Sequence, residues 1–359
     1  MTRRSALAFL AILALAPAGV VAQEQGFHRL PVDVLDVVAP SEWVQGIPGQ
    51  MSIRPRECRA LPIESVRRRI IEVAVQEWAF FGSPVLDRAN GARLLPPGTV
   101  RAPDEPMFES NMRRAPGLNP IESARVAPTI AGYWAVTPEG PGIVAEQNNR
   151  WNGRQGVAAR WNAPWSAAFI SWVMCEGGLG TNTLFRRAIA HRSYIDQAIR
   201  ARDGQAPEAA YVAYDIGEQP VEPGDLLCTA RRPVYRNLAE RRREMGQGAS
   251  SHCDIVVEVD EEGQRILAIG GNVLRSVSLK VLPALPDARG HLRPDATSLT
   301  FFAHLKLRAD PIGPTPLVDS AILAAFTCRA EGTPPSRTAF VADRLAFAST
   351  QADTPTQGC

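Results

Sequence analysis

The sequence has almost no lysine and no marked excess of either charge. Its two lysines are Lys280 and Lys306, so arginine carries nearly all of the positive charge. The 39 basic and 37 acidic residues become equal in number once Arg3 and Arg4, which belong to an expected leader, are left out. A neutral chain lacks the basic excess that binds nucleic acids or anionic membrane surfaces. We therefore expect no nucleic-acid partner.

Long apolar runs are also scarce. The clearest one, residues 6–16 (ALAFLAILALA), is too short to span a bilayer as a helix. It follows Arg3 and Arg4 and precedes small residues, which is typical of a signal peptide over residues 1–22, cleaved near Ala22. The arginine pair partly resembles a twin-arginine signal, so both export routes stay open. We expect an exported protein, periplasmic or extracellular, without a stable membrane anchor.

No internal repeat is visible, and 45% hydrophobic with 21% charged residues is a globular composition. We expect an N-terminal arm over residues 23–60 and one main domain over residues 61–310. Within that domain, residues 84–130 are rich in Pro, Arg and Asn and predict a long irregular insertion. Residues 311–359 predict a tail rich in Pro, Thr and Ala, around one short helix at 317–326.

Helical periodicity marks three segments, at residues 62–81, 164–176 and 183–201. The clearest is 164–176, where one apolar stripe runs through Trp165, Ala168, Phe169, Trp172 and Val173. Asn162 is a plausible N-cap for it, and the glycines at 177–178 end it.

Strand signals dominate the later chain. Residues 252–259 (HCDIVVEV) alternate, with Cys253 and Ile255 on one face and His252 and Asp254 on the other. The other strand candidates are residues 222–230, 265–270, 273–281 and 299–307. The order of helices followed by an antiparallel meander predicts an α+β fold.

Six cysteines in an exported chain predict disulfides. Cys228 ends one expected strand and Cys253 begins another, so a bridge there would join a hairpin. Cys328 and Cys359 would fasten the C-terminal tail. Cys58 and Cys175 are then left as the remaining pair.

The alternative to the disulfide between Cys228 and Cys253 is a metal site. Its ligands would be Cys228, His252, Cys253 and Asp254. Adjacent strand residues point to opposite faces, which keeps His252 and Cys253 from sharing one ion. We therefore assign no metal ion and no cofactor.

Three polar residues stand where chemistry is expected. Ser166 lies in the first turn of the strongest helix, where free N–H groups and the helix dipole favour developing negative charge. His252 opens a strand and is a candidate general base, and Asn272 follows a Gly-Gly pair and could orient the imidazole. The simpler alternatives are a helix-start serine, a strand-edge histidine and a turn asparagine.

Other side chains are weighed beside this candidate triad. Trp165 would shape the wall of a cleft, and Tyr133 could line a groove, although aromatic residues at such positions usually belong to the core. Asp254 shares a face with His252 and could support its ring or a substrate. We expect His191 to be a residue on a helix surface.

The stretch PWSAAFISW (164–172) resembles the nucleophile helix of the NlpC and CHAP superfamily of papain-like amidases and peptidases. The resemblance continues in order through PGDL (223–226), HCDIVV (252–257) and GGNV (270–273). The span from about 62 to 308, with QEWAFFG at 76–82, is similar to a secreted bacterial family, domain of unknown function 2272. The resemblance implies a papain-like helix packed on an antiparallel sheet, and peptidoglycan peptides as substrate.

The departure from that superfamily lies at the nucleophile, which is cysteine there and Ser166 here. A serine is not ionised in the ground state, so it depends more on a base and an oxyanion hole. One hypothesis is an exported hydrolase of cell-wall peptide or amide bonds that uses Ser166, His252 and Asn272. The other is a catalytically silent domain that binds peptidoglycan or a protein partner.

Overall fold

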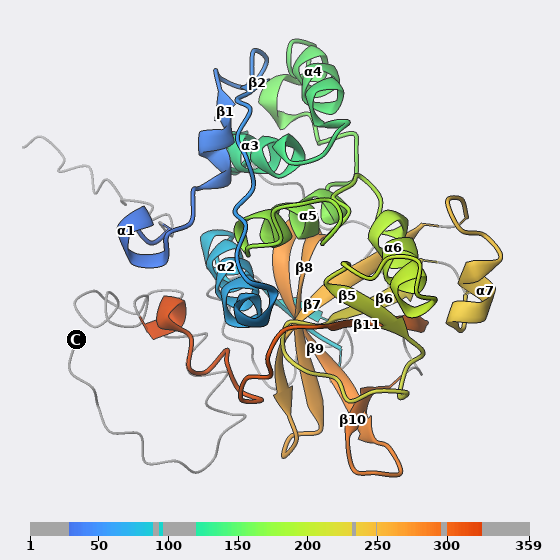
Figure 1. The fold of residues 1–359 in the computed structure, drawn as a ribbon. Helices are drawn as coiled ribbons and strands as arrows, with labels where there is room; N and C mark the ends of the chain where they lie inside the picture. The colour runs from blue at the N-terminus through green and yellow to red at the C-terminus, as the bar shows by residue number, and fades with distance from the viewer. Residues whose placement is uncertain are drawn as a thin grey trace, which may run out of the picture.

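The computed structural model describes residues 29–88, 93–95, 120–231, 235–248, 250–295 and 300–324. It is a mixed α and β structure in which helices cover a large twisted sheet (Figure 1). The α-helices are α1 (Val32–Leu35), α2 (Val66–Phe80), α3 (Pro120–Ala135), α4 (Gly140–Trp151), α5 (Ser166–Glu176), α6 (Arg192–Arg202) and α7 (Leu238–Arg242). Short 3-10 helices are η1 (Pro40–Trp43), η2 (Ile63–Ser65) and η4 (Gly156–Ala158).

The main sheet has the strand order β4-β3-β9-β8-β7-β6-β11-β5, with β10 paired to β9. Its strands are β3 (Val85–Asp87), β4 (Arg93–Leu95), β5 (Tyr211–Tyr214), β6 (Leu226–Ala230), β7 (Ser251–Asp260), β8 (Arg265–Val273), β9 (Ser276–Pro286), β10 (Leu292–Pro294) and β11 (Phe301–Leu307). A separate two-stranded sheet joins β1 (Val44–Gln45) and β2 (Ser52–Ile53). The pairs are antiparallel except β3 with β9, so the predicted meander β7-β8-β9 is confirmed.

Helices α2 and α5 pack on the sheet, while α3 and α4 lie beyond α5 with the N-terminal elements beside them (Figure 1). Every residue of α5 is buried, so this helix is central to the core. Its contact with β8 depends on Gly271, because a Cβ there would lie 2.5 Å from Cβ of Phe169. A smaller apolar cluster, which includes Val256, Ile266 and Leu282, covers the opposite face.

Helix α2 confirms the prediction for residues 62–81, but most of its polar residues are buried, and only Arg68 is exposed. Arg67 is buried and donates from Nη2 to the Leu307 carbonyl at 2.9 Å and from Nη1 to the Pro223 carbonyl at 2.5 Å. Its Nη1 also lies 3.2 Å from Oδ1 of Asp225. Since strand ends expose carbonyl groups, a buried arginine can satisfy several of them at once.

Several predicted boundaries are wrong. Asn162 does not cap α5, because this helix begins at Ser166 with Trp165 at the N-cap; the Asn162 amide instead bonds Glu146. Helix α6 begins only at Arg192, so its predicted first part is a loop and turns.

The predicted break after residue 270 is also wrong. Strand β8 continues to Val273 through a bulge, in which Asn272 adopts φ 55°. The described parts of the supposed irregular insertion carry β3, β4 and the start of α3. The signal peptide, residues 96–119 and the Cys328–Cys359 pair lie outside the described residues.

The described part of the chain contains two disulfides. Cys228 and Cys253 face each other across β6 and β7, as their strand positions predicted. Cys58 is bonded to Cys175, which ties the segment before α2 to the end of α5. Each bridge of this kind contributes about 3 kcal/mol to stability. Both are consistent with an exported protein, and no helix among the described residues is long and apolar enough to cross a membrane.

Candidate functional site

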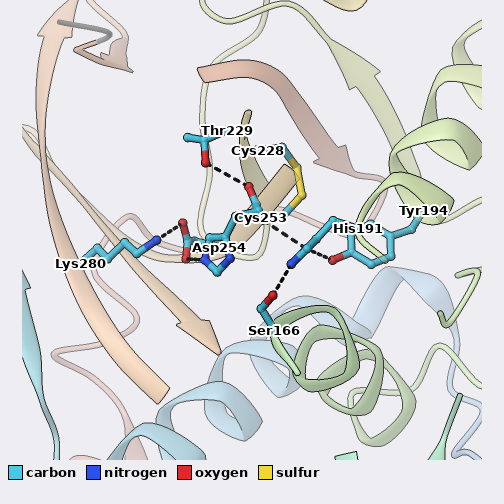
Figure 2. Close-up of a disulfide and its surroundings, with 9 residues drawn as sticks. Ser166, His191, Tyr194, Cys228, Thr229, Cys253, Asp254 and Lys280 are labelled. Atoms are coloured by element: carbon cyan, nitrogen blue, oxygen red, sulfur yellow. Dashed lines mark hydrogen bonds and ion pairs between the residues drawn. A yellow bond between two sulfur atoms is a disulfide. The ribbon is translucent and has the colours of Figure 1, made fainter. Parts of the chain in front are cut away.

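Ser166 is the first residue of α5, and its side chain faces a second element rather than water. Its fractional exposure is 3%. Oγ lies 2.7 Å from Nε2 of His191, the residue immediately before α6 (Figure 2). The expectation that His191 lies on a helix surface is wrong. Because α6 starts late, His191 stands at its N-cap and is buried against α5.

The hydrogen bonds of His191 fix its tautomer. The backbone N–H of Cys253 donates to Nδ1 at 3.2 Å, and the hydroxyl of Tyr194 bonds the same nitrogen. A backbone N–H can only donate, so Nδ1 is unprotonated and Nε2 carries the hydrogen. His191 therefore donates to Ser166. Burial, followed by the charge of His252, holds the pKa of His191 well below its usual value, which keeps the ring neutral.

His252 belongs to a second polar group on β7 and β9. Its Nε2 lies 2.8 Å from Oδ1 of Asp254, whose Oδ2 accepts a hydrogen bond of 2.8 Å from Nζ of Lys280. Burial alone would raise the pKa of Asp254, but Lys280 and His252 outweigh it and lower that pKa. Asp254 is therefore an ionised acceptor, and His252 must carry its hydrogen on Nε2.

This arrangement leaves Nδ1 of His252 as the basic nitrogen. Burial and then the charge of Lys280 lower the pKa of His252, so the ring is neutral at pH 7. The centroids of the His252 and His191 rings are 5.1 Å apart. The start of α5 thus meets the sheet at a contiguous polar group of five residues, Ser166, His191, His252, Asp254 and Lys280.

Gly270 makes room for this group. A Cβ on Gly270 would lie 1.9 Å from Oδ1 of Asp254 and 3.0 Å from Nε2 of His252. The hydrogen bond between the histidine and the carboxylate therefore passes over β8 at a residue without a side chain. The glycine pair at 270–271 is the sequence signal that marks this position.

The predicted roles of Asn272 and His252 change accordingly. Among the described residues, no hydrogen bond joins the Asn272 side chain to His252, because the bulge in β8 holds Asn272 in a left-handed conformation. Asp254 orients the ring instead. The direct partner of Ser166 is His191, and the described residues contain no hydrogen bond between Ser166 and His252.

The aromatic candidates belong to the core. Tyr133 is fully buried, and its hydroxyl donates to Glu77. Trp165 stacks on Phe81 with ring centroids 5.8 Å apart, and lies as close to Tyr133. Neither side chain forms a substrate groove in this structure, although both fix the start of α5 where Ser166 lies.

The described residues contain no group of His, Cys, Asp and Glu side chains arranged to hold a metal ion. Cys228 and Cys253 are consumed by their disulfide. Two surface hollows lie elsewhere, one near Thr181 and one near Arg160. In this conformation the polar group is covered.

The fold and site therefore define a mixed α+β protein with a buried serine, two histidines and a carboxylate at one end of a sheet. Residues 127–301 match the model of a family described as an uncharacterized protein conserved in bacteria (DUF2272). The matched span contains all five residues of the polar group, which are Ser166, His191, His252, Asp254 and Lys280. No curated protein and no solved structure matches the chain.

Proposed function

We propose that residues 61–310 form a papain-like domain of the NlpC and CHAP type, which acts as an exported hydrolase of cell-wall peptide or amide bonds. The observation that carries the proposal is the state of His252. An ionised carboxylate accepts its Nε2–H and leaves Nδ1 free, which is how a nucleophile's base is prepared. Asp254 takes the orienting role first given to Asn272.

In the proposed reaction, Oγ of Ser166 attacks the carbonyl carbon while its proton passes to Nδ1 of His252. The C–O bond of an acyl-enzyme forms as the C–N bond breaks, and His252 returns the proton to the leaving nitrogen. Water then cleaves the ester, with His252 again taking and returning a proton. The N-terminus of α5 favours the negative charge that develops beside Ser166.

His191 holds the serine in a resting position. Its Nε2–H donates to Oγ, so the serine must turn from His191 toward His252 before it attacks. Exchange of one neutral hydrogen bond costs about 1 kcal/mol. Such a rotation is compatible with catalysis, because hydrogen bonds in unliganded sites are often not yet in their reactive arrangement.

The burial of Ser166 and the direction of its hydrogen bond favour a second candidate function. A serine that accepts from histidine and lies 3% exposed is not primed for attack. The alternative is a catalytically silent domain of the same fold that binds peptidoglycan or a protein partner outside the cell.

The test compares purified mature protein with Ser166→Ala and Ser166→Cys, using muropeptides and simple esters as substrates. Ser171→Ala is the matched control, because Ser171 is a buried serine of the same helix that bonds the Ala188 backbone. Turnover by the wild type and the control, lost in Ser166→Ala, supports the hydrolase. Turnover only in Ser166→Cys indicates a silent site with retained geometry, and sacculus binding without turnover favours the binding domain.

A further inference from the structure

A hollow of about 450 Å³ lies beside the end of α4 and the loop that leads toward Ser166. It is lined by Arg150, Gln155, Ala158 and Arg160. Arg150 and Arg160 are exposed, and their guanidinium groups give the hollow a positive character. The hollow is distinct from the buried polar group.

The arginines of this hollow lack acidic partners. No Asp or Glu stands between Glu146 and Glu176 in the sequence, and Oε1 of Glu146 accepts from the Asn162 amide at 2.9 Å. Within the described part of the chain, neither Arg150 nor Arg160 forms an ion pair. Other surface arginines do so, as Arg202 does with Glu218 and Arg242 with Asp203.

A third arginine interacts electrostatically with Arg160. Arg275 lies in the turn between β8 and β9, and burial together with the charge of Arg160 lowers its pKa. Its Nη1 is buried and has no hydrogen-bond partner among the described residues. The same holds for the indole N–H of Trp161, which follows Arg160. Buried donors without acceptors cost about 1–3 kcal/mol each, so a ligand that supplies acceptor atoms to these two donors would be favourable.

We propose that this hollow binds the carboxylates of an acidic peptide. The planar guanidinium fork matches a carboxylate in bidentate geometry, and separate arginines suit a ligand with more than one carboxylate. The near-zero net charge of the mature chain provides no wider basic surface for a nucleic acid. Ser166 lies six positions after Arg160, a span of at most about 22 Å, so a peptide held here can extend toward the serine.

The extension toward Ser166 rests on the proposed function, whereas the binding itself does not. Calorimetry with the mature protein would compare three probes: triglutamate, triglutamine and inorganic phosphate. We expect binding of triglutamate that weakens with added salt, and none of triglutamine. Phosphate binding without triglutamate binding overturns the peptide assignment, and so does equal binding of the two peptides or no binding of triglutamate.

The double variant Arg160→Gln/Arg275→Gln should weaken triglutamate binding at least about tenfold, the loss of one good charged contact. Arg236→Gln is the control, since Arg236 is a largely exposed arginine that pairs with Glu240. Melting curves confirm that each variant is folded. Unchanged binding in the double variant contradicts the proposal. Ser166→Ala should bind like the wild type, which separates this result from any failure of hydrolysis.

Discussion

The described residues contain two buried pairs of histidine and aspartate, and the two pairs have different surroundings. In one, Nε2 of His304 lies 2.8 Å from Asp225, with Arg67 beside the carboxylate. In the other, His252 and Asp254 have the same 2.8 Å separation, with Lys280 as the cation.

The difference lies in the free nitrogen of each histidine. Nδ1 of His304 is buried and has no partner among the described residues, and its aspartate accepts from the Leu307 backbone. The His252 ring instead lies against His191, which holds Ser166. A histidine–carboxylate pair is therefore insufficient evidence of catalysis; the nearby serine, our proposed nucleophile, distinguishes the candidate site from the structural pair.

The largest loss of stability is expected from a change beside the structural pair, His304 and Asp225. Arg67→Met leaves Asp225 without its arginine and removes the donors of several backbone carbonyls. Removing one partner of a buried ion pair destabilises a protein by about 3–5 kcal/mol. Denaturant unfolding would measure this loss, while turnover per folded molecule should not change. A loss of unfolding free energy below about 1 kcal/mol would show that the contacts between Arg67, Asp225 and the backbone carbonyls are not structural.

Glu258 extends the comparison because it lies on β7 with Asp254 but forms no ion pair among the described residues. Burial raises the pKa of Glu258 to about 7, and Asp260 adds to the rise although the Val318 N–H opposes it. A carboxyl with a raised folded pKa stabilises the fold at low pH, and this contribution is lost as pH rises from about 4.5 through 7.

Glu258→Gln should therefore gain up to about 3 kcal/mol at pH 8 relative to the wild type, and little at pH 4. Urea unfolding at both pH values measures the difference. An equal gain in stability at the two pH values would contradict a raised pKa of Glu258 as its cause.

Gly270→Ala tests the geometry of the candidate pair. The added methyl group would meet Asp254 at 1.9 Å and force His252 and Asp254 apart. Overpacking of this kind costs about 1–3 kcal/mol, and hydrolysis should fall by a larger factor than stability predicts. Gly142→Ala is the control, since a Cβ there meets nothing within 4 Å. Retained turnover in Gly270→Ala would show that hydrolysis does not depend on the hydrogen bond between His252 and Asp254.

The smallest change in the pH dependence of the proposed activity is expected from the charge of Lys280. Lys280 lowers the pKa of both His252 and Asp254, so Lys280→Met should raise both. The acidic limb of the pH–rate profile should then move to higher pH, because protonated His252 cannot act as a base. NMR titration of the histidine rings gives an independent measurement. A shift in the opposite direction would contradict the arrangement of charges.

Sequence patterns predicted the placement of several residues of the candidate site. The apolar stripe of residues 164–176 placed Ser166 at a helix start, and the alternation in residues 252–259 put His252 and Asp254 on one face. Strand positions also identified the disulfide partners Cys228 and Cys253. These features depend on local periodicity, which a sequence displays directly.

Other features depend on tertiary contacts and could not be inferred in this way. His191 turns inward because α6 begins at Arg192, and element boundaries are the least certain part of a sequence pattern. The bulge in β8 moved Asn272 away from its expected role. The burial of Arg67 follows from carbonyl groups at distant strand ends, which have no local signature.

The most direct test is covalent labelling of the purified protein with a fluorophosphonate, followed by peptide mass spectrometry. We expect an adduct on Ser166 that forms at least about 100-fold more slowly in His252→Gln, the usual contribution of a general base. His304→Gln, which changes the structural pair, should still be labelled at Ser166 once folded. No adduct on Ser166, or equal labelling in His252→Gln and the wild type, would contradict the assignment of His252 as the base.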